Sequence, residues 1–343
     1  MSRKAEIMVI YTGGTIGMVE DSTTGVLNPF NFKHITDQIP EIRKFGFNID
    51  SISFDPLIDS SNMQPEIWVR LARIIEEHYE KYDGFVILHG TDTMAYTASA
   101  LSFMLENLSK PVILTGSQLP IGKIRTDGKE NFITALEIAA AKSNGHSTVP
   151  EVCIYFEFKL YRGNRTHKYN AEHFQAFRSV NYPELAIAGV EIKYDYAAIQ
   201  KATGAEFRVF TKLDTHVAIL KLFPGITREV VSALLHTKGL KAIVMETYGS
   251  GNAPTFPWFI DELSNAIKNG LIIYNITQCK GGAVKMGMYE TSNDLLNIGV
   301  IGGHDITAEA AITKLMYLLG NNYPPDGLKK CLQSSLRGEI TIG

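Results

Sequence analysis

Cysteine is scarce in this chain of 343 residues, and its placement excludes two common structural frameworks. The three cysteines, Cys153, Cys279 and Cys331, lie far apart and form no Cys-x-x-Cys pair. An odd number of scattered thiols indicates neither a disulfide framework nor a zinc site. The nine histidines show no His-x-His or His-x-x-x-His spacing either. We therefore expect no metal and no cofactor, and such thiols are typical of a reducing compartment.

Long apolar runs and an excess of one charge are also missing. The apolar run nearest the N-terminus is the short segment Ile7–Tyr11, and no run reaches the roughly eighteen residues that a membrane-spanning helix needs. The formal net charge is −3, and no Lys/Arg cluster exceeds the pair Lys329-Lys330. These absences argue against a membrane protein and against a nucleic-acid partner. Together with the thiols, they predict a cytoplasmic protein.

The chain does contain a regular alternation of short apolar runs and helical patterns. Apolar runs typical of buried strands occur at Ile7–Tyr11, Phe85–Leu88, Val112–Thr115 and Val152–Phe156. Helices are expected from Pro65 onward and near Thr93–Leu108 and Asp127–Ala141. Strands separated by helices predict an α/β fold with a mainly parallel sheet flanked by helices.

A polar stretch divides this pattern into two halves. The segment from about Glu191 to Leu213 has mixed charge and no clear period. Beyond it, strands are expected at Val217–Leu222, Ala242–Met245, Leu271–Ile276 and Gly299–Ile301, and helices near Thr227–His236, Ile260–Lys268 and Thr307–Leu319. Thr307 is a candidate cap for the last of these helices. We predict a larger N-terminal α/β domain at 1–192, a linker at 193–212 and a smaller C-terminal α/β domain at 213–343.

Small and hydroxyl-bearing residues follow the first expected strand. The segment reads Thr12-Gly13-Gly14-Thr15-Ile16-Gly17, and its glycines permit a tight turn and a close approach to a ligand. Reactive groups in parallel α/β sheets tend to lie just beyond the carboxyl ends of strands. On its own, the segment is explained more simply as a plain turn or a phosphate-binding loop. The Lys-Ser/Thr of a P-loop and a Gly-x-Gly-x-x-Gly pattern are both missing, which weakens the nucleotide interpretation.

Similar polar segments stand at other expected element ends. They are His89-Gly90-Thr91-Asp92, Gly116-Ser117-Gln118, Asp59-Ser60-Ser61 and the basic loop Arg162–Lys168. Taken singly, each is explained at least as well by a helix cap, a polar turn or a solvated surface. Taken together, they bring hydroxyl groups, backbone amides and carboxylates to successive strand ends. A site for a small zwitterion needs this combination of groups.

At this point the residues resemble a known family, the bacterial-type L-asparaginases. The pair Thr12–Ile16 and His89–Met94, in this order and spacing, is highly specific. Further segments that resemble the family are Asp59–Ser61, Gly116–Pro120, Arg125–Gly128, Leu160–Arg165, Tyr248–Pro254 and Gly299–Gly303. The resemblance therefore covers essentially the whole chain, and it is strongest to the cytoplasmic (type I) branch.

The resemblance implies roles for individual residues. Thr15 would be the nucleophile, and Thr91, Asp92 and Lys168 would form a second catalytic cluster. The residues implied in substrate binding are Asp59, Ser60, Ser61, Thr91, Asp92 and Ser117. Family active sites lie at subunit contacts, so a homodimer or homotetramer is implied.

The implied reaction is the hydrolysis of L-asparagine to L-aspartate and ammonia. Thr15 would attack the carboxamide carbon, ammonia would leave, and water would release aspartate from the acyl-enzyme. A lysine that acts as a base must be neutral, whereas a neighbouring carboxylate such as Asp92 favours its charged form. The sequence leaves this tension at Lys168 open.

The chain departs from the family in the loop after the first motif. Many family members carry a tyrosine there that contacts the nucleophile, whereas residues 21–28 of this chain contain none. Tyr289 is our candidate for a replacement phenol donor. A packed surface tyrosine explains Tyr289 at least as well.

Other functions stay open at this point. A glutaminase, or an enzyme that accepts both amides, is hard to separate from an asparaginase, because one methylene is worth only about 1–3 kcal/mol in a pocket. A non-catalytic asparagine-binding protein would need the pocket but neither Thr15 nor Lys168. The tRNA amidotransferase subunit that resembles this family carries an extra N-terminal domain, for which we expect no room before Thr12. A nucleotide-dependent kinase would need a phosphate-binding lysine that the glycine loop lacks.

Overall fold

A computed structural model describes residues 3–20, 27–29, 39–287 and 290–342 of the chain. The chain divides into two compact units, Met1–Thr211 and Lys212–Gly343. Each unit contains a sheet with parallel strands and flanking helices. The predicted α/β fold with a larger N-terminal and a smaller C-terminal part is confirmed. The boundaries of the linker at 193–212 stay a prediction.

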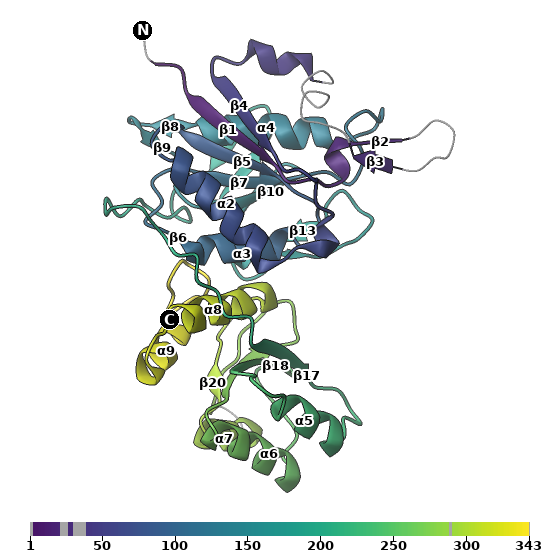
Figure 1. The fold of residues 1–343 in the computed structure, drawn as a ribbon, viewed down its shortest axis with the longest axis vertical. Helices are drawn as coiled ribbons and strands as arrows, with labels where there is room; N and C mark the ends of the chain where they lie inside the picture. The colour runs from purple at the N-terminus through teal and green to yellow at the C-terminus, as the bar shows by residue number, and fades with distance from the viewer. Residues whose placement is uncertain (1–2, 21–26, 30–38, 288–289, 343) are drawn as a thin grey trace. The chain divides into compact units, whose positions relative to one another are not determined.

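The N-terminal unit is built on an eight-stranded sheet with the order β15-β14-β11-β10-β7-β5-β1-β4 (Figure 1). The strands are β1 (Glu6–Tyr11), β4 (Asn48–Ser53), β5 (Gly84–Leu88), β7 (Val112–Thr115), β10 (Val152–Phe156), β11 (Lys159–Arg162), β14 (Ala186–Ala188) and β15 (Ile192–Tyr194). The five strands from β4 to β10 are mutually parallel, whereas β11, β14 and β15 are antiparallel to their neighbours. Parallel strands end at the same edge, so the loops that follow β1, β5 and β7 are brought together there.

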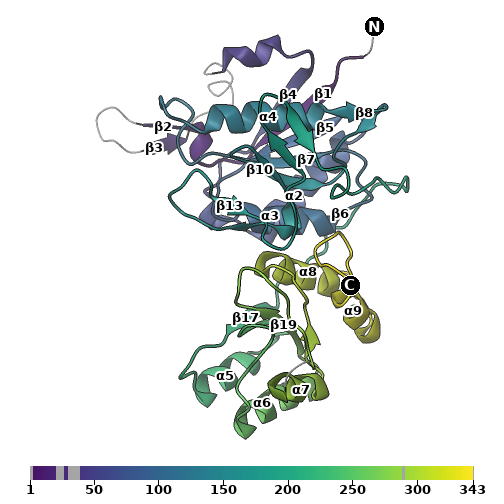
Figure 2. The same cartoon turned by 180° about the vertical axis from the view of Figure 1, so that it is seen from behind.

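Helices cover both faces of this sheet. In Figures 1 and 2, α2 (Pro65–His78) and α3 (Met94–Met104) lie on one face and α4 (Gly128–Ala140) lies on the other. The side chains of Val9 and Tyr11 in β1 share a core cluster with α4. Because successive side chains of a strand point to opposite faces, the intervening residues of β1 are buried on the α2–α3 side. Burial on both faces explains why these strands are unbroken apolar runs.

Short ladders and 3-10 turns complete the N-terminal unit. The ladders are β2 (Met18–Glu20) with β3 (Leu27–Pro29), β6 (Leu105–Glu106) with β16 (Arg208–Val209), β8 (Lys142–Ser143) with β9 (His146–Ser147), and β12 (His167–Lys168) with β13 (Phe177–Arg178). The turns are η1 (Thr15–Gly17), η2 (Pro40–Lys44), η3 (Ser60–Asn62) and η4 (Gly163–Arg165). The helix expected to reach Leu108 ends at Met104, because Leu105 has an extended backbone and pairs with Val209.

The C-terminal unit contains a four-stranded parallel sheet with the order β17-β18-β19-β20. Its elements are β17 (Val217–Lys221), α5 (Arg228–Leu235), β18 (Ala242–Thr247), α6 (Pro257–Lys268), β19 (Ile272–Thr277), α7 (Glu290–Asn297), β20 (Ile301–Gly302), α8 (Ala308–Gly320) and α9 (Pro325–Leu332). Helix α6 begins three residues before the predicted Ile260, because Pro257 occupies the first helical position. In neither unit is a described helix long and apolar enough to cross a membrane.

The predicted cap of α8 is confirmed. The Thr307 hydroxyl oxygen accepts a hydrogen bond from the Ala310 backbone N–H at 3.1 Å. We expect Thr307→Ala to lower the free energy of unfolding by about 1 kcal/mol, because an end-of-helix N–H loses its acceptor. Urea unfolding of both proteins would measure this loss. Thr227 occupies the same position of α5 without a side-chain cap bond, so Thr227→Ala should have a smaller effect.

Candidate active site

A pocket of ≈ 250 Å³ lies at the carboxyl edge of the N-terminal sheet. Its lining residues are Gly14, Thr15, Met18, Asp59, Ser60, Gly90, Thr91, Asp92, Gln118, Lys168 and Ala171. Six of the predicted site residues are thus brought to one pocket from four segments of the chain. Ser61 and Ser117 do not line it, and Tyr289 lies outside the described residues.

Glycines allow the strand-end loops to pack against one another. Gly14 has a φ of 94°, and a Cβ atom there would lie 2.6 Å from the Gly90 backbone nitrogen. A Cβ atom on Gly90 would in turn lie 2.5 Å from the Ser60 hydroxyl oxygen. No side chain fits at either position without a shift of its neighbours. These close approaches at Gly14 and Gly90 therefore hold the loops that carry Thr15, Ser60 and Thr91 in a single wall.

Thr15 lies in that wall as the first residue of η1. Its side chain is half-buried, and its hydroxyl makes no hydrogen bond to any other described residue. By contrast, the Thr12 hydroxyl is buried and donates to the Leu88 carbonyl oxygen at 2.9 Å. Of these two threonines in the first motif, only Thr15 has a hydroxyl that lines the pocket.

Lys168 lies at the centre of a polar cluster in the pocket. Its Nζ donates to the Thr91 hydroxyl oxygen at 2.8 Å and to Asp92 Oδ1 at 2.6 Å. The Lys168 side chain is 18% exposed, whereas that of Asp92 is 62% exposed. The amine is therefore enclosed by the fold and held next to a hydroxyl, while the carboxylate stays accessible from the pocket. The family resemblance implied this group of three, and the structure brings them together.

Gln118 is a pocket residue that the sequence interpretation did not single out. Its Oε1 accepts from the Thr91 hydroxyl at 3.4 Å, and its Nε2 donates to the carbonyl oxygens of Ala171 and His173, both at 3.1 Å. The Asp127 carboxylate accepts from the Gln118 backbone N–H at 2.9 Å. Gln118 thus links Thr91 to the loop that follows Lys168. Its place directly after Ser117 at a strand end was the available signal.

Carboxylate and hydroxyl groups lie on the wall formed by η3. Ser60 is buried, while Asp59 is exposed to the pocket. The Ser61 backbone N–H and hydroxyl both donate to Asp59 Oδ1 at 2.9 Å and lower the pKa of that carboxyl below its usual value. Ser117 is buried, and its hydroxyl donates to the Leu119 carbonyl oxygen at 2.6 Å.

A buried chain of hydrogen bonds supports Gly90 from behind. His89 Nδ1 is 2.6 Å from the Gly90 carbonyl oxygen, which can only accept, so Nδ1 carries the proton. His89 Nε2 then accepts from the Thr97 hydroxyl at 2.9 Å, and the Thr97 oxygen accepts from Trp68 Nε1 at 3.0 Å. Every donor in this series of hydrogen bonds has an acceptor only when the His89 ring is neutral. The neutral ring therefore fixes the peptide that precedes Thr91.

Burial lowers the pKa of His89 from 6.5 to about 4. Between these values the unfolded chain binds a proton at His89 and the folded protein does not. The free energy of unfolding should therefore fall as pH drops from 6.5 to 4, by about 3 kcal/mol from this group. Urea unfolding at several pH values would measure the slope. His89→Gln should flatten it, whereas replacement of the exposed His146 by Gln should leave it unchanged.

Metal-binding geometry is not found around this pocket. Throughout the part of the chain that the structure describes, no three His, Cys, Asp or Glu side chains could together hold a metal ion. The polar groups of the pocket are instead hydroxyls, carboxylates, one amide and one amine. This set suits acyl chemistry with an activated hydroxyl nucleophile.

Comparisons with known proteins agree over the whole chain. Residues 6–200 match the family described as asparaginase, N-terminal, and residues 216–332 match the glutaminase/asparaginase C-terminal domain. L-asparaginase 1 of Escherichia coli (strain K12) is 44% identical, with 99% of each chain covered. The structure of L-asparaginase I from Vibrio cholerae is 41% identical with a TM-score of 0.90, covering 99% of this chain and 100% of that one. The thermostable L-asparaginase from Thermococcus kodakarensis is 34% identical with a TM-score of 0.90, covering 98% and 100%. Both halves match, so the chain belongs to the L-asparaginase family.

Proposed function

We propose that this protein is an L-asparaginase that hydrolyses L-asparagine to L-aspartate and ammonia, with Thr15 as nucleophile. The observation that carries the proposal is that the free Thr15 hydroxyl lines the same pocket as the Thr91–Asp92–Lys168 cluster. Similarity along the full length to proteins named L-asparaginase supports the choice of reaction.

The pocket offers partners for each end of the amino-acid head group. Asp59 and Asp92 are exposed carboxylates that can accept from the substrate's ammonium group. The Ser60 hydroxyl can donate to the α-carboxylate. Ser61 would act by holding Asp59, to which it donates two hydrogen bonds. The role predicted for Ser117 in binding stays a prediction.

The reaction proceeds in two acyl-transfer steps. Thr15 Oγ1 attacks the carboxamide carbon, the C–N bond breaks, and the NH2 group takes up the proton lost by the Thr15 hydroxyl and leaves as ammonia. Water then attacks the resulting ester carbon, and the C–O bond to Thr15 breaks to release aspartate. The backbone N–H groups of Thr91 and Asp92 donate to no described acceptor and can bind the oxyanion, a contribution of about 3–4 kcal/mol per donor.

The Thr91–Lys168 pair provides the proton path. The Lys168 amine donates to the Thr91 oxygen, whose own proton is directed at Gln118 Oε1. When Lys168 is neutral and the Thr91 hydroxyl turns from Gln118 toward the amine nitrogen, Thr91 can pass its proton to Lys168 as it takes one from water or from the attacking Thr15 hydroxyl. Asp92 holds the Lys168 amine in place and stabilises the ammonium that forms.

We also propose a cytoplasmic homodimer or homotetramer. The three cysteines are all free thiols, which fits a reducing compartment. The oligomer follows from the family resemblance, and closed symmetric assemblies are the commonest form of soluble oligomers. Light scattering of the purified protein would measure the mass of the assembly, and a monomer would contradict it.

Ammonia release by the wild-type protein tests the reaction. We expect release from L-asparagine, and L-glutamine should be measured side by side because one methylene changes the rate by only about 10–200-fold. A comparable rate from both amides would establish the dual asparaginase/glutaminase. Release from neither would overturn the enzyme assignment, and a saturable binding signal for L-asparagine would then establish the non-catalytic binding protein.

A further inference from the structure

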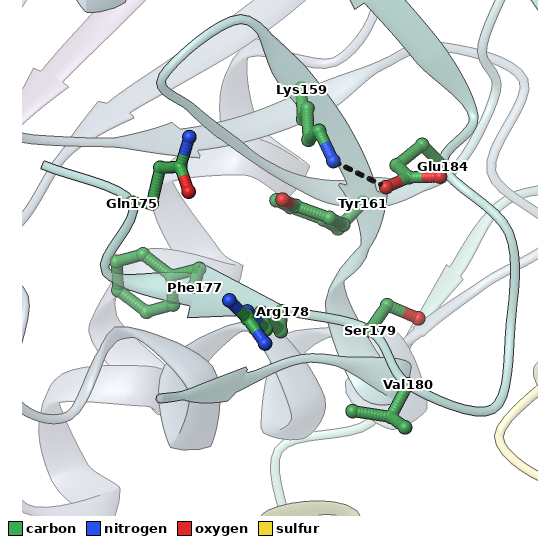
Figure 3. A pocket seen from close by; sticks show the side chains of 8 residues that line it. All are labelled: Lys159, Tyr161, Gln175, Phe177, Arg178, Ser179, Val180 and Glu184. Carbon is green, nitrogen blue, oxygen red and sulfur yellow. Dashed lines mark hydrogen bonds and ion pairs between the residues drawn. The ribbon is translucent and has the colours of Figure 1, made fainter. Parts of the chain in front are cut away.

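A second pocket lies in the N-terminal unit, and it shares no lining residue with the candidate active site. Its volume is ≈ 280 Å³, close to the lower end of the roughly 300–1,000 Å³ found for ligand pockets. Figure 3 shows the side chains of Tyr161, Gln175, Phe177 and Arg178 around one space, with Lys159 and Glu184 beyond the Tyr161 ring. A ligand that fits here must be small.

Tyr161 brings an unused polar group to this pocket. Its side chain lines the pocket with only 5% of the residue exposed, and its hydroxyl has no hydrogen-bond partner among the residues described. Burial raises the pKa of this hydroxyl, so it keeps its proton and acts as a donor. The hydroxyl is open to the pocket, where an oxygen of a ligand could accept its hydrogen bond.

Arg178 also lines this pocket and brings a guanidinium group whose N–H donors are unused. Its guanidinium carbon lies 4.0 Å from the centroid of the Tyr169 ring, so the group is held by stacking. Across residues 3–20, 27–29, 39–287 and 290–342, no carboxylate pairs with it and no acceptor receives its N–H groups. A planar guanidinium with unoccupied N–H groups matches a carboxylate in geometry and charge.

The remaining walls limit the ligand further. Lys159 Nζ is 2.8 Å from Glu184 Oε1, so these two charges balance each other and leave Arg178 as the unpaired charge of the lining. Phe177 and Val180 supply apolar surface. The combination fits a single negative charge joined to a short apolar chain.

We propose that this pocket binds a small monocarboxylate, whose carboxylate is held by the Arg178 guanidinium and the Tyr161 hydroxyl, and that its occupancy alters turnover at the candidate active site.

The path between the two pockets is one β-hairpin. In the β12–β13 ladder, Lys168 is directly opposite Phe177, and His167 is opposite Arg178. The Tyr169 backbone N–H donates to the Ala176 carbonyl oxygen at 2.7 Å and closes the hairpin. A ligand that fixes Arg178 against Tyr169 therefore restrains the strand that carries the Lys168 amine. Coupling of this kind is reciprocal, so substrate would change the ligand's affinity by the same factor.

Binding of n-butyrate, followed by ligand-observed NMR, tests the site without relying on catalysis. We expect saturable binding to the wild type and none of the neutral isostere butyramide. Arg178→Gln and Tyr161→Phe should each weaken butyrate binding by about tenfold or more, since each removes a hydrogen bond to a charged group. Arg208→Gln, in the separate β6–β16 ladder, removes the same charge elsewhere and should leave binding unchanged.

Ammonia release measured with and without butyrate tests the coupling. We expect butyrate to change kcat for the wild type and to leave Arg178→Gln unaffected. Butyrate binding that Arg178→Gln does not weaken would overturn the site, and binding without any change in turnover would overturn the coupling. If Arg178→Gln fails to fold, as judged by circular dichroism, Tyr161→Phe alone decides the site. Failure of the asparaginase assignment would leave the binding result intact.

Discussion

Replacing Thr15 by alanine is expected to lower kcat for L-asparagine by roughly 10⁴-fold or more, because no acyl-enzyme can then form. The loss should come without unfolding. Thr15 is half-buried at the pocket wall, and its hydroxyl bonds to no other described residue, so alanine leaves no buried group unpaired. Steady-state ammonia release, together with thermal unfolding of both proteins, would separate the chemical effect from a structural one.

Thr15→Ser is the matched control for this experiment. Serine keeps the oxygen and removes only a methyl group, so measurable activity should return relative to Thr15→Ala. Trapping of an aspartyl ester on the protein should succeed with the wild type and fail with Thr15→Ala. A Thr15→Ala protein that kept a tenth of the wild-type rate would rule out Thr15 as nucleophile. Thr91, the other pocket threonine, would then be examined in the same way.

The parts of the fold that the sequence predicted well are the ones buried on both faces. β5 and β7 are unbroken apolar runs because helices cover both sides of the sheet, and their residues are all buried. β4 was not recognised. At this edge of the sheet only Ile49 and Ile52 are half-buried, and the other residues of Asn48–Ser53 are polar and exposed, so the strand shows no regular alternation. β14 and β15 are three-residue strands at the other edge, too short for a period to be read.

The candidate site shows a similar division. Thr15, Thr91 and Asp92 lie in recognisable segments that follow β1 and β5 within four residues, so local sequence carries the information. Gln118 and the buried chain from Trp68 through Thr97 to His89 depend on contacts between residues distant in sequence. Thr97 in α3 accepts a hydrogen bond from Trp68 in α2. No local sequence pattern distinguishes Thr97 from any other buried threonine in a helix. Such supporting contacts require the three-dimensional structure.

Replacing Lys168 by methionine is the second change with a large expected effect. We expect kcat for L-asparagine to fall by roughly 10²–10⁴-fold, as for loss of a general acid–base group. KM should change far less, because the amine contacts Thr91 and Asp92 and is not among the groups proposed to bind the substrate's head group. Methionine keeps the apolar stem within a side chain that is 18% exposed. Lys193→Met, at an exposed position of β15, is the matched control and should leave kcat unchanged.

Lys168→Arg separates two roles that Lys168→Met removes together. Arginine remains charged at any working pH, so it can pair with Asp92 but cannot take a proton from Thr91. If Lys168 works as a base, Lys168→Arg should be as slow as Lys168→Met, although Asp92 keeps a cationic partner. If the lysine contributes only its charge, Lys168→Arg should recover a large part of kcat. The neutral-lysine proton path proposed here requires the first result, and recovery by arginine would exclude it.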